Sequence, residues 1–171
     1  MNRFARIATT VAHASRRPKI GLYAPAELAL RVWPGEADYR YVHHSVYPLY
    51  MELGRWDFGI RCGLARFMIA RRCAGILGSQ IIHCQRPLAR FQRFVVHTRA
   101  ASWDDKWLYV ETRLEAEGKP YSWGCARVLF QDEKGRRVEP SEVIRAAGGD
   151  ERPAPPSVAA GLLAQFGQTS I

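Results

Sequence analysis

Four strand-like segments in the second half of the sequence place the tightest limit on its fold. Within residues 93–102, Phe94, Val96 and Thr98 alternate with side chains that would point the opposite way. A repeat of two is typical of a strand with one buried face. Short polar turns at 104–106 and 117–120 join segments of this kind as hairpins do. The sequence therefore predicts an antiparallel meander made of Ile76–Gln85, Arg93–Ser102, Trp107–Leu114 and Ser122–Phe130.

A long helix is predicted ahead of the meander, over Ser45–Arg61. Ser45 is suited to cap its first turn, Pro48 is tolerated there because its missing N–H matters little, and Gly63 is suited to end it. Four apolar residues at helical spacing predict a single buried stripe: Leu49, Leu53, Trp56 and Ile60. A shorter strand, Leu28–Trp33, is predicted before this helix and ends at Pro34-Gly35.

The order strand, long helix and meander predicts the α+β class. The apolar stripe of the helix needs a cover, so we expect a curved antiparallel sheet wrapped around one long central helix. The 171 residues suit one such domain. We expect a basic N-terminal segment at 1–20, the domain at 21–147, and a Pro- and Gly-rich linker with a C-terminal tail at 148–171. A short helix, Pro140–Ala147, ends the domain, and 158–171 is either a docked helix or disordered.

The formal net charge of +9 favours an anionic partner, such as a phosphorylated small molecule. The basic residues are spread along the whole chain rather than gathered beside aromatic ones, so we expect no nucleic acid as a partner. No apolar stretch approaches the roughly 18 residues of a membrane-spanning helix. Residues 1–15 lack the apolar core of a secretory signal, which favours a cytoplasmic protein.

The N-terminal residues 3–15 have the pattern of a short amphipathic helix, with Phe4, Ile7, Ala8, Val11 and Ala12 on one face. Arginines lie within and just after this stretch, and no acidic residue occurs before Glu27. Such a helix suits peripheral contact of residues 1–17 with an anionic membrane surface. The small apolar face favours the alternative, a terminal helix that frays or docks on the core.

Neither a metal nor a cofactor is expected. No CxxC pair occurs among the four cysteines, which we expect to be reduced thiols: Cys62, Cys73, Cys84 and Cys125. His83 and His97 fall on predicted strands, and no third ligand lies at a recognisable spacing.

Two short segments, Arg31-Val-Trp-Pro34 and Met51-Glu-Leu-Gly-Arg55, carry a family resemblance. They resemble hotdog acyl-CoA thioesterases of the 4-hydroxybenzoyl-CoA thioesterase-like branch, which place the pattern D-x-D-x-x-x-H-x-N-N-x-x-Y between two such segments. Counting forward from Pro34 puts the D-x-D on Glu36-Ala37-Asp38. The resemblance implies a hotdog fold, an acyl-CoA or another acyl thioester as the substrate, and a site built in a homodimer or a dimer of dimers.

Counting back from Arg55 puts the family tyrosine on Tyr47, the Asn-Asn pair on His43-His44 and the family histidine on Tyr41. The family histidine and both family asparagines are therefore replaced in this sequence. A second alignment puts the family histidine on His44 and the tyrosine on Tyr50, but it misaligns the Leu-Gly-Arg segment.

The resemblance implies that Asp38 acts on the thioester carbonyl, as nucleophile or as base for water. Amides at the start of the Ser45 helix would polarise the carbonyl oxygen, because a helix N-terminus concentrates unsatisfied N–H groups. His43 and His44 titrate in a range suited to assist, or they are structural. The residues suited to bind substrate are Tyr47, Ser45, Ser79 and, for the phosphates of coenzyme A, Arg86 and Arg90.

The role of Asp38 remains open, because it is either catalytic or a loop carboxylate paired with Arg40. Glu52 on the helix is a reserve candidate for catalysis.

Three functions also remain open. The first function is hydrolysis of an acyl thioester. The second is a non-catalytic hotdog protein that binds such a ligand, favoured by the altered stretch 41–44. The third is a surface-associated protein that uses its basic N-terminus.

Overall fold

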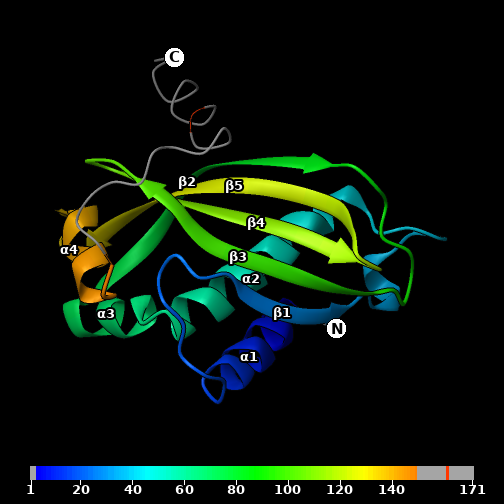
Figure 1. The fold of residues 1–171 in the computed structure, drawn as a ribbon, viewed down its shortest axis with the longest axis horizontal. Coiled ribbons are helices and arrows are strands. Elements are labelled where there is room, and N and C mark those ends of the chain that lie inside the picture. Colours follow the sequence, from blue (N-terminus) through cyan, green and yellow to red (C-terminus); the bar gives the residue numbers. More distant parts are fainter. Residues whose placement is uncertain (1–2, 150–160, 162–171) are drawn as a thin grey trace.

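A six-stranded antiparallel sheet dominates the computed structural model, which describes residues 3–149 and 161 (Figure 1). The strand order is β1-β3-β4-β5-β2, and the short β6 pairs with β5. The strands are β1 (Ala26–Arg31), β2 (Cys73–Cys84), β3 (Arg93–Trp103), β4 (Leu108–Ala116), β5 (Lys119–Asp132) and β6 (Arg137–Val138).

The sheet curves over helix α2 (Tyr47–Arg61), and helix α1 (Arg3–Ala14) packs against α2 on the side away from the sheet (Figure 1). Helices α3 (Leu64–Arg71) and α4 (Pro140–Ala146) contact each other at one end of the sheet. Two 3-10 turns, η1 (Pro34–Glu36) and η2 (His44–Val46), lie between β1 and α2. The predicted α+β class, a curved antiparallel sheet around one long helix, is confirmed.

The predicted meander is right for β3, β4 and β5, which pair in chain order, and wrong for β2, which pairs with β5. The segment between β2 and β3 passes β5 and β4 to reach β3, which lies between β1 and β4. The amides of Gln85 and Arg86 both donate to the carbonyl of Tyr121. β1 runs from residue 26 to 31, two residues ahead of its predicted position at 28–33. Alternation fixes the existence of each strand but not its neighbour.

The helix start differs from the prediction. α2 begins at Tyr47, and the side chain of His43 caps the preceding turn by accepting the N–H of Ser45 at 3.3 Å. Ser45 is therefore not the cap, because the imidazole in front of the turn already takes that role.

The predicted stripe of α2 is correct only at Leu53. Leu53 is fully buried, whereas Leu49 and Ile60 are half-buried and Trp56 is 40% exposed. The sheet covers the neighbouring face of the helix, where Tyr50, Met51 and Phe58 are almost wholly inaccessible. Helical spacing shows which residues share a face of α2. Two faces of this helix are apolar, so spacing alone does not show which of them the sheet buries.

Gly54 lies where α2 comes close to the sheet. A Cβ atom at this position would lie 2.4 Å from Thr98 Oγ1 and 2.7 Å from Val96 Cγ1. Thr98 and Thr112 are buried beneath it with their hydroxyl oxygens 3.4 Å apart. The glycine of the Met51–Arg55 segment is therefore required by packing, because a side chain would push the helix off the sheet.

Helix α3 was not predicted. Gly63, at φ +90°, ends α2 as expected, and α3 begins at the next residue. Only Leu64 and Phe67 of its eight residues are buried. An element this short with two buried side chains gives too little periodicity to be recognised.

The N-terminal helix docks on α2, which is the alternative favoured for it, but through a polar face. Arg6, Thr10 and Ala14 are the buried residues of α1, while Phe4 on the predicted apolar face is 71% exposed. Arg17, just after the helix, reaches the fully buried Asp57 of α2 at 3.4 Å. Ion pairs to carboxylates of the domain, rather than an apolar stripe, hold this segment in place.

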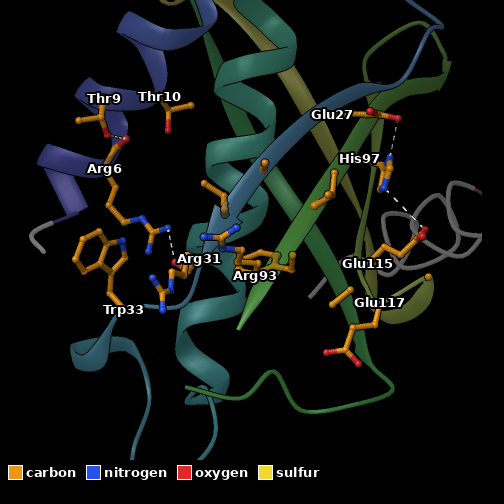
Figure 2. A pocket seen from close by; sticks show the side chains of 16 residues that line it. Arg6, Thr9, Thr10, Glu27, Arg31, Trp33, Arg93, His97, Glu115 and Glu117 are labelled. Carbon is orange, nitrogen blue, oxygen red and sulfur yellow. Dashed lines mark hydrogen bonds and ion pairs between the residues drawn. The ribbon is translucent and has the colours of Figure 1, made fainter. Parts of the chain in front are cut away.

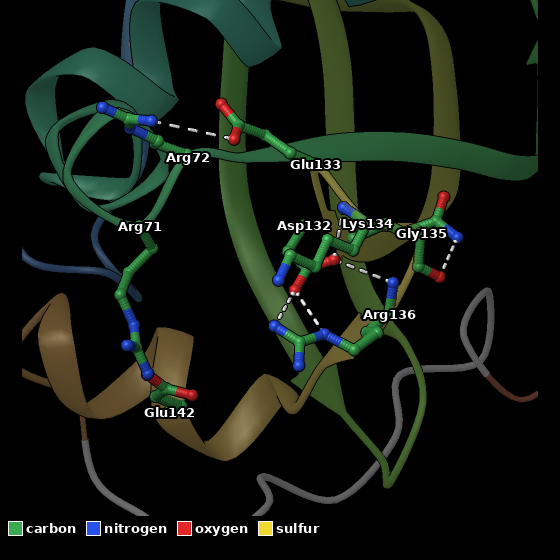
Figure 3. A network of polar contacts seen from close by, with 9 residues as sticks. Arg71, Arg72, Asp132, Glu133, Lys134, Gly135, Arg136 and Glu142 are labelled. Carbon is green, nitrogen blue, oxygen red and sulfur yellow. Dashed lines mark hydrogen bonds and ion pairs between the residues drawn. The ribbon is translucent and has the colours of Figure 1, made fainter.

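The end of the sheet near α3 and α4 is closed by polar contacts (Figure 3). Arg71 pairs with Glu142 of α4, and Arg72 lies 3.9 Å from Glu133. In the β5–β6 turn the backbone N–H of Arg136, aided by its guanidinium, lowers the pKa of Asp132. None of these residues belongs to the motif of 36–47. The predicted tail at 148–171 falls almost wholly outside the described residues.

Candidate functional site

The segment 33–47 links β1 to α2 and contains the whole site motif. Its first carboxylate, Glu36, is buried and accepts three donors: the guanidinium of Arg6, the hydroxyl of Tyr50 at 3.0 Å and the N–H of Trp33 at 2.9 Å. A carboxylate satisfied in this way is a structural anchor, because no face of it is open to a substrate.

Asp38 lies two residues further on, exposed on a tight loop. An isolated bridge between Ala37 and Val42 closes the loop, and the amide of Asp38 donates to the carbonyl of Tyr41 at 3.0 Å. No ion pair joins Asp38 to Arg40 among the described residues, where Arg40 instead lies over the ring of Tyr41 at 5.6 Å. The carboxylate of Asp38 is therefore accessible.

A second loop, 85–92, supports the first. The amide of Val42 donates to Leu88, the amide of Arg90 donates to Arg40, and a bridge joins Tyr41 to Ala89. This pairing brings Arg90, predicted to bind substrate phosphates, beside the Asp38 loop. Arg90 is exposed and lies over the ring of Phe91 at 5.0 Å, whereas Arg86 donates to the carbonyl of Pro120 at 2.6 Å.

His43, His44 and Ser45 form a compact group at the start of α2. The rings of His43 and His44 lie 4.1 Å apart, and His43 Nδ1 lies 2.7 Å from the Ser45 hydroxyl. The amides of Ser45 and Val46 are used within this turn. In the described part of the chain the amide of His44 has no acceptor, so it is the open N–H of the first turn.

Tyr47 is buried rather than open to a ligand. Its hydroxyl accepts the amide N–H of Leu88 at 3.1 Å, and burial raises the pKa of Tyr47. Tyr47 therefore connects α2 to the 85–92 loop through this hydrogen bond.

A large cavity, of about 990 Å³, lies between the outer side of α2 and β2. Ser45, Leu49, Glu52 and Trp56 line it from the helix side, and Gln80 lines it from β2. Glu52 is paired with Arg3 of α1 at 2.7 Å. Burial lowers the pKa of Arg55, which also lines this cavity. A mostly apolar space with a few polar groups at one end is the usual form of a small-molecule site.

A smaller cavity, of about 700 Å³, lies over β1 and β3 (Figure 2). Arg31 and Arg93 face each other across the two strands at one end. At the other end His97 lies 3.7 Å from Glu27 and 3.8 Å from Glu115. None of the predicted site residues lines this cavity.

Of the eight predicted site residues, only Ser45 lines either of these cavities. His43, His44 and Ser45 lie together at the helix start, and of these Ser45 lines the larger cavity. Asp38 lines neither cavity. Ser79 also lies outside both, and its buried hydroxyl has no partner among the described residues.

Sequence reasoning did not identify the group of Arg6, Glu36 and Tyr50. Glu36 was placed in the D-x-D, but nothing in the spacing pointed to an arginine 30 residues earlier as its partner. The sequence feature that could have indicated this group is Arg6, a charged residue inside the apolar pattern of the terminal helix.

No group of three or more His, Cys, Asp or Glu side chains suited to a metal ion occurs in the described part of the chain. No helix there is both long and apolar enough to cross a membrane. Peripheral contact of residues 1–17 with a membrane, and a cytoplasmic location, stay predictions.

The sequence matches the model of the thioesterase-like superfamily over residues 32–161. The match covers more than half of the chain, and the chain belongs to this superfamily. It begins after α1, so the N-terminal helix lies outside the matched segment. No curated protein matches the sequence.

Solved structures similar to this chain have the same fold. A hypothetical protein from Thermus thermophilus is 31% identical, with a TM-score of 0.64, over 72% of this chain and 95% of that one. A probable thioesterase from Bartonella henselae is 18% identical, with a TM-score of 0.61, over 68% and 98%. A DHNA-CoA thioesterase from Staphylococcus aureus is 12% identical, with a TM-score of 0.64, over 85% and 97%. The hotdog fold implied by the sequence resemblance is confirmed.

Proposed function

We propose that this protein hydrolyses an acyl-CoA or another acyl thioester to the free acid and the thiol. The observation that carries the proposal is the larger cavity, which opens beside the start of α2 in a chain of the thioesterase-like superfamily. Its volume of about 990 Å³ and its apolar lining suit an acyl group.

Asp38 is the proposed nucleophile or general base. As a base, it takes a proton from water, the water oxygen adds to the thioester carbonyl, and the carbon–sulfur bond then breaks to release the thiolate, which regains a proton. The open amide of His44 is proposed to stabilise the oxyanion. Support for Asp38 comes from its exposed, unpaired carboxylate and from the D-x-D position of the sequence.

A second copy of the chain is part of this proposal, because Asp38 does not line the larger cavity of its own chain. β2 is an edge strand that carries exposed Ile76 and Leu77, and long apolar edges favour pairing with another chain. Substitution Ile76→Lys, at an exposed edge residue that does not line the cavity, is expected to turn a dimer into a monomer in sedimentation analysis and to abolish activity. A monomeric wild type with full activity would contradict the dimer.

Arg90, beside the Asp38 loop, and Arg86, on the neighbouring turn, are proposed to bind the phosphates of coenzyme A. Both lie on the 85–92 loop, and both are exposed. Guanidinium groups bind phosphate with short charge-assisted hydrogen bonds. The double substitution Arg86→Ala and Arg90→Ala is expected to raise KM for acyl-CoA and to leave KM for a short acyl-pantetheine thioester unchanged.

The direct test is thiol release over a panel of acyl-CoA substrates, with Asp38→Asn as the paired variant. Wild-type release that Asp38→Asn lowers by several hundredfold supports the proposal. Release that is equal in both proteins would remove Asp38 from the mechanism.

A second function, binding of an acyl thioester without cleavage, is favoured by the side chains at 41–44. Tyr41, His43 and His44 stand where the family pattern has a histidine and two asparagines. Saturable binding of acyl-CoA in calorimetry without any thiol release would support this function, and the absence of binding would exclude it.

A further inference from the structure

A buried arginine of the N-terminal helix is bonded directly to the segment that carries Asp38. Arg6 is only 3% exposed, and its guanidinium pairs with Glu36 and donates to the carbonyl of Arg31 at 3.3 Å. The same group lies 5.5 Å from the centre of the Tyr50 ring. Figure 2 shows Arg6 reaching from α1 toward β1 beside Trp33. These contacts leave Arg6 a single position.

Glu36 depends on this arginine. The other two donors to its carboxylate, the Tyr50 hydroxyl and the Trp33 amide, carry no charge. Burial and the neighbouring Glu36 carboxylate raise the pKa of Tyr50, so its hydroxyl remains protonated and able to donate. A buried carboxylate that loses its cation is strongly unfavourable, and the segment would open to reach water.

Glu36 in turn holds the base of the loop. Its carbonyl accepts the amide of His43 at 3.2 Å, and the next residue forms the Ala37–Val42 bridge. Asp38 therefore lies two residues after Glu36 at the start of the loop. His43, which caps the turn before α2, ends the loop and is bonded to Glu36.

We propose that Arg6 is a positioning residue of the candidate thioesterase site, which it serves by fixing segment 36–43 through Glu36. This inference rests on the proposed function for its consequence in catalysis. It assigns a role in the site to α1, a helix that lies outside the segment shared with the superfamily.

Arg17 provides a matched control from the same N-terminal region. Like Arg6, it joins a buried carboxylate to a backbone carbonyl of β1, here Asp57 and Glu27. It has no contact with segment 36–43 among the described residues. Loss of Arg17 therefore removes an attachment of the same region to β1 without touching the Asp38 loop, and it leaves Asp57 with Arg61 as its remaining cation at 3.2 Å.

The test compares Arg6→Met, Arg6→Lys and Arg17→Met by hydrogen exchange and by steady-state kinetics. Arg6→Met is expected to speed exchange at the amides of Asp38, Val42 and His43 more than at those of β4. It is expected to lower kcat by up to ~100-fold with KM nearly unchanged, since a small misplacement of catalytic groups can cost that much. Arg6→Lys keeps a cation and is expected to restore most of both. Arg17→Met is expected to leave exchange in 36–43 and kcat unchanged.

Unchanged exchange in 36–43, or an unchanged kcat in Arg6→Met, would overturn the inference. Equal losses in Arg6→Met and Arg17→Met would do the same, because they would show a general loss of stability. If the wild type releases no thiol, the proposed function fails while exchange still decides the role of Arg6. If Arg6→Met does not fold, Glu36→Gln removes the carboxylate charge with which Arg6 pairs, and unchanged exchange in 36–43 would then reject the proposal.

Discussion

The two sides of α2 differ in what they require of the sequence. On the packed side, Tyr50, Met51 and Leu53 are wholly buried, and Gly54 is pressed against the sheet. On the cavity side, Leu49, Glu52 and Trp56 face an open space of about 990 Å³. The packed side leaves no room for change, while the cavity side can vary with the ligand. The difference indicates that one face of the helix sets the fold, while the other is the face that we propose meets the acyl group.

The largest effect is expected from truncation on the packed side. Leu53→Ala should lower the free energy of unfolding by about 2–5 kcal/mol, because it leaves a cavity in a close-packed core. Trp56→Ala, three residues along the same helix, should lower it by less than about 1 kcal/mol, since the side chain is already 40% exposed. Chemical denaturation measures both, and equal losses would erase the distinction between the two sides.

A pair of glycines sharpens the comparison. Gly54→Ala should destabilise by about 1–3 kcal/mol because its Cβ would clash with Thr98 and Val96. Gly59, on the cavity side, has nothing within 4 Å of a built Cβ. Gly59→Ala should stabilise by about 0.5–1 kcal/mol through the better helix propensity of alanine. The Tm of Gly54→Ala should fall and the Tm of Gly59→Ala should rise. A lower Tm in both variants would contradict the open space next to Gly59.

The cavity side should reveal itself in substrate binding. Trp56→Ala is expected to raise KM for acyl-CoA about tenfold, which corresponds to ~1.4 kcal/mol of lost apolar contact. The value of kcat should change little, because Trp56 is not among the groups proposed to act on the carbonyl. An unchanged KM across acyl chains of different length would remove this cavity as the acyl site.

The smallest effect is expected in the reactivity of the cysteine thiols, which reports how far each thiol is buried. Burial raises the pKa of Cys62 to about 11 and that of Cys125 to about 12, whereas Cys84 is exposed. At pH 8 a maleimide should label Cys84 first and leave Cys62 and Cys125 unlabelled until the protein unfolds.

The same pKa shifts predict a change of stability with pH. Each folded-state pKa is raised above the ordinary 9.0, so the contribution to stability is fully present below pH 9 and is lost as pH rises toward about 11–12. The free energy of unfolding should therefore fall between pH 9 and pH 11, and by less in Cys62→Ala. An equal fall in the wild type and in Cys62→Ala would show that a group other than Cys62 causes the loss of stability.

The fold was predictable from the sequence where a pattern repeats. Alternation located β3, β4 and β5, and apolar residues at helical spacing located the central helix. The position of β2 at the sheet edge was not predictable, because alternation carries no information on which strand is the neighbour. The buried face of α2 was chosen wrongly because the face with Trp56 and Ile60 is as apolar in sequence as the face with Met51 and Phe58, and only the sheet distinguishes the two.

The site was predictable only as a segment. The D-x-D position led to Glu36 and Asp38, yet nothing local separates the buried anchor from the exposed carboxylate. That difference arises from Arg6, which is brought to Glu36 by the docking of α1. Ser45 was taken as the helix cap because serine is common there, whereas the contact of His43 with the turn is decided by the backbone before it.

The measurement that tests the central claim most directly is thiol release from a panel of acyl-CoA substrates by the wild type, Asp38→Asn and Trp56→Ala. The account predicts release by the wild type, near-complete loss of kcat in Asp38→Asn, and a raised KM with kcat retained in Trp56→Ala. Release that Asp38→Asn leaves intact, or no release from any acyl-CoA in the panel, would contradict it.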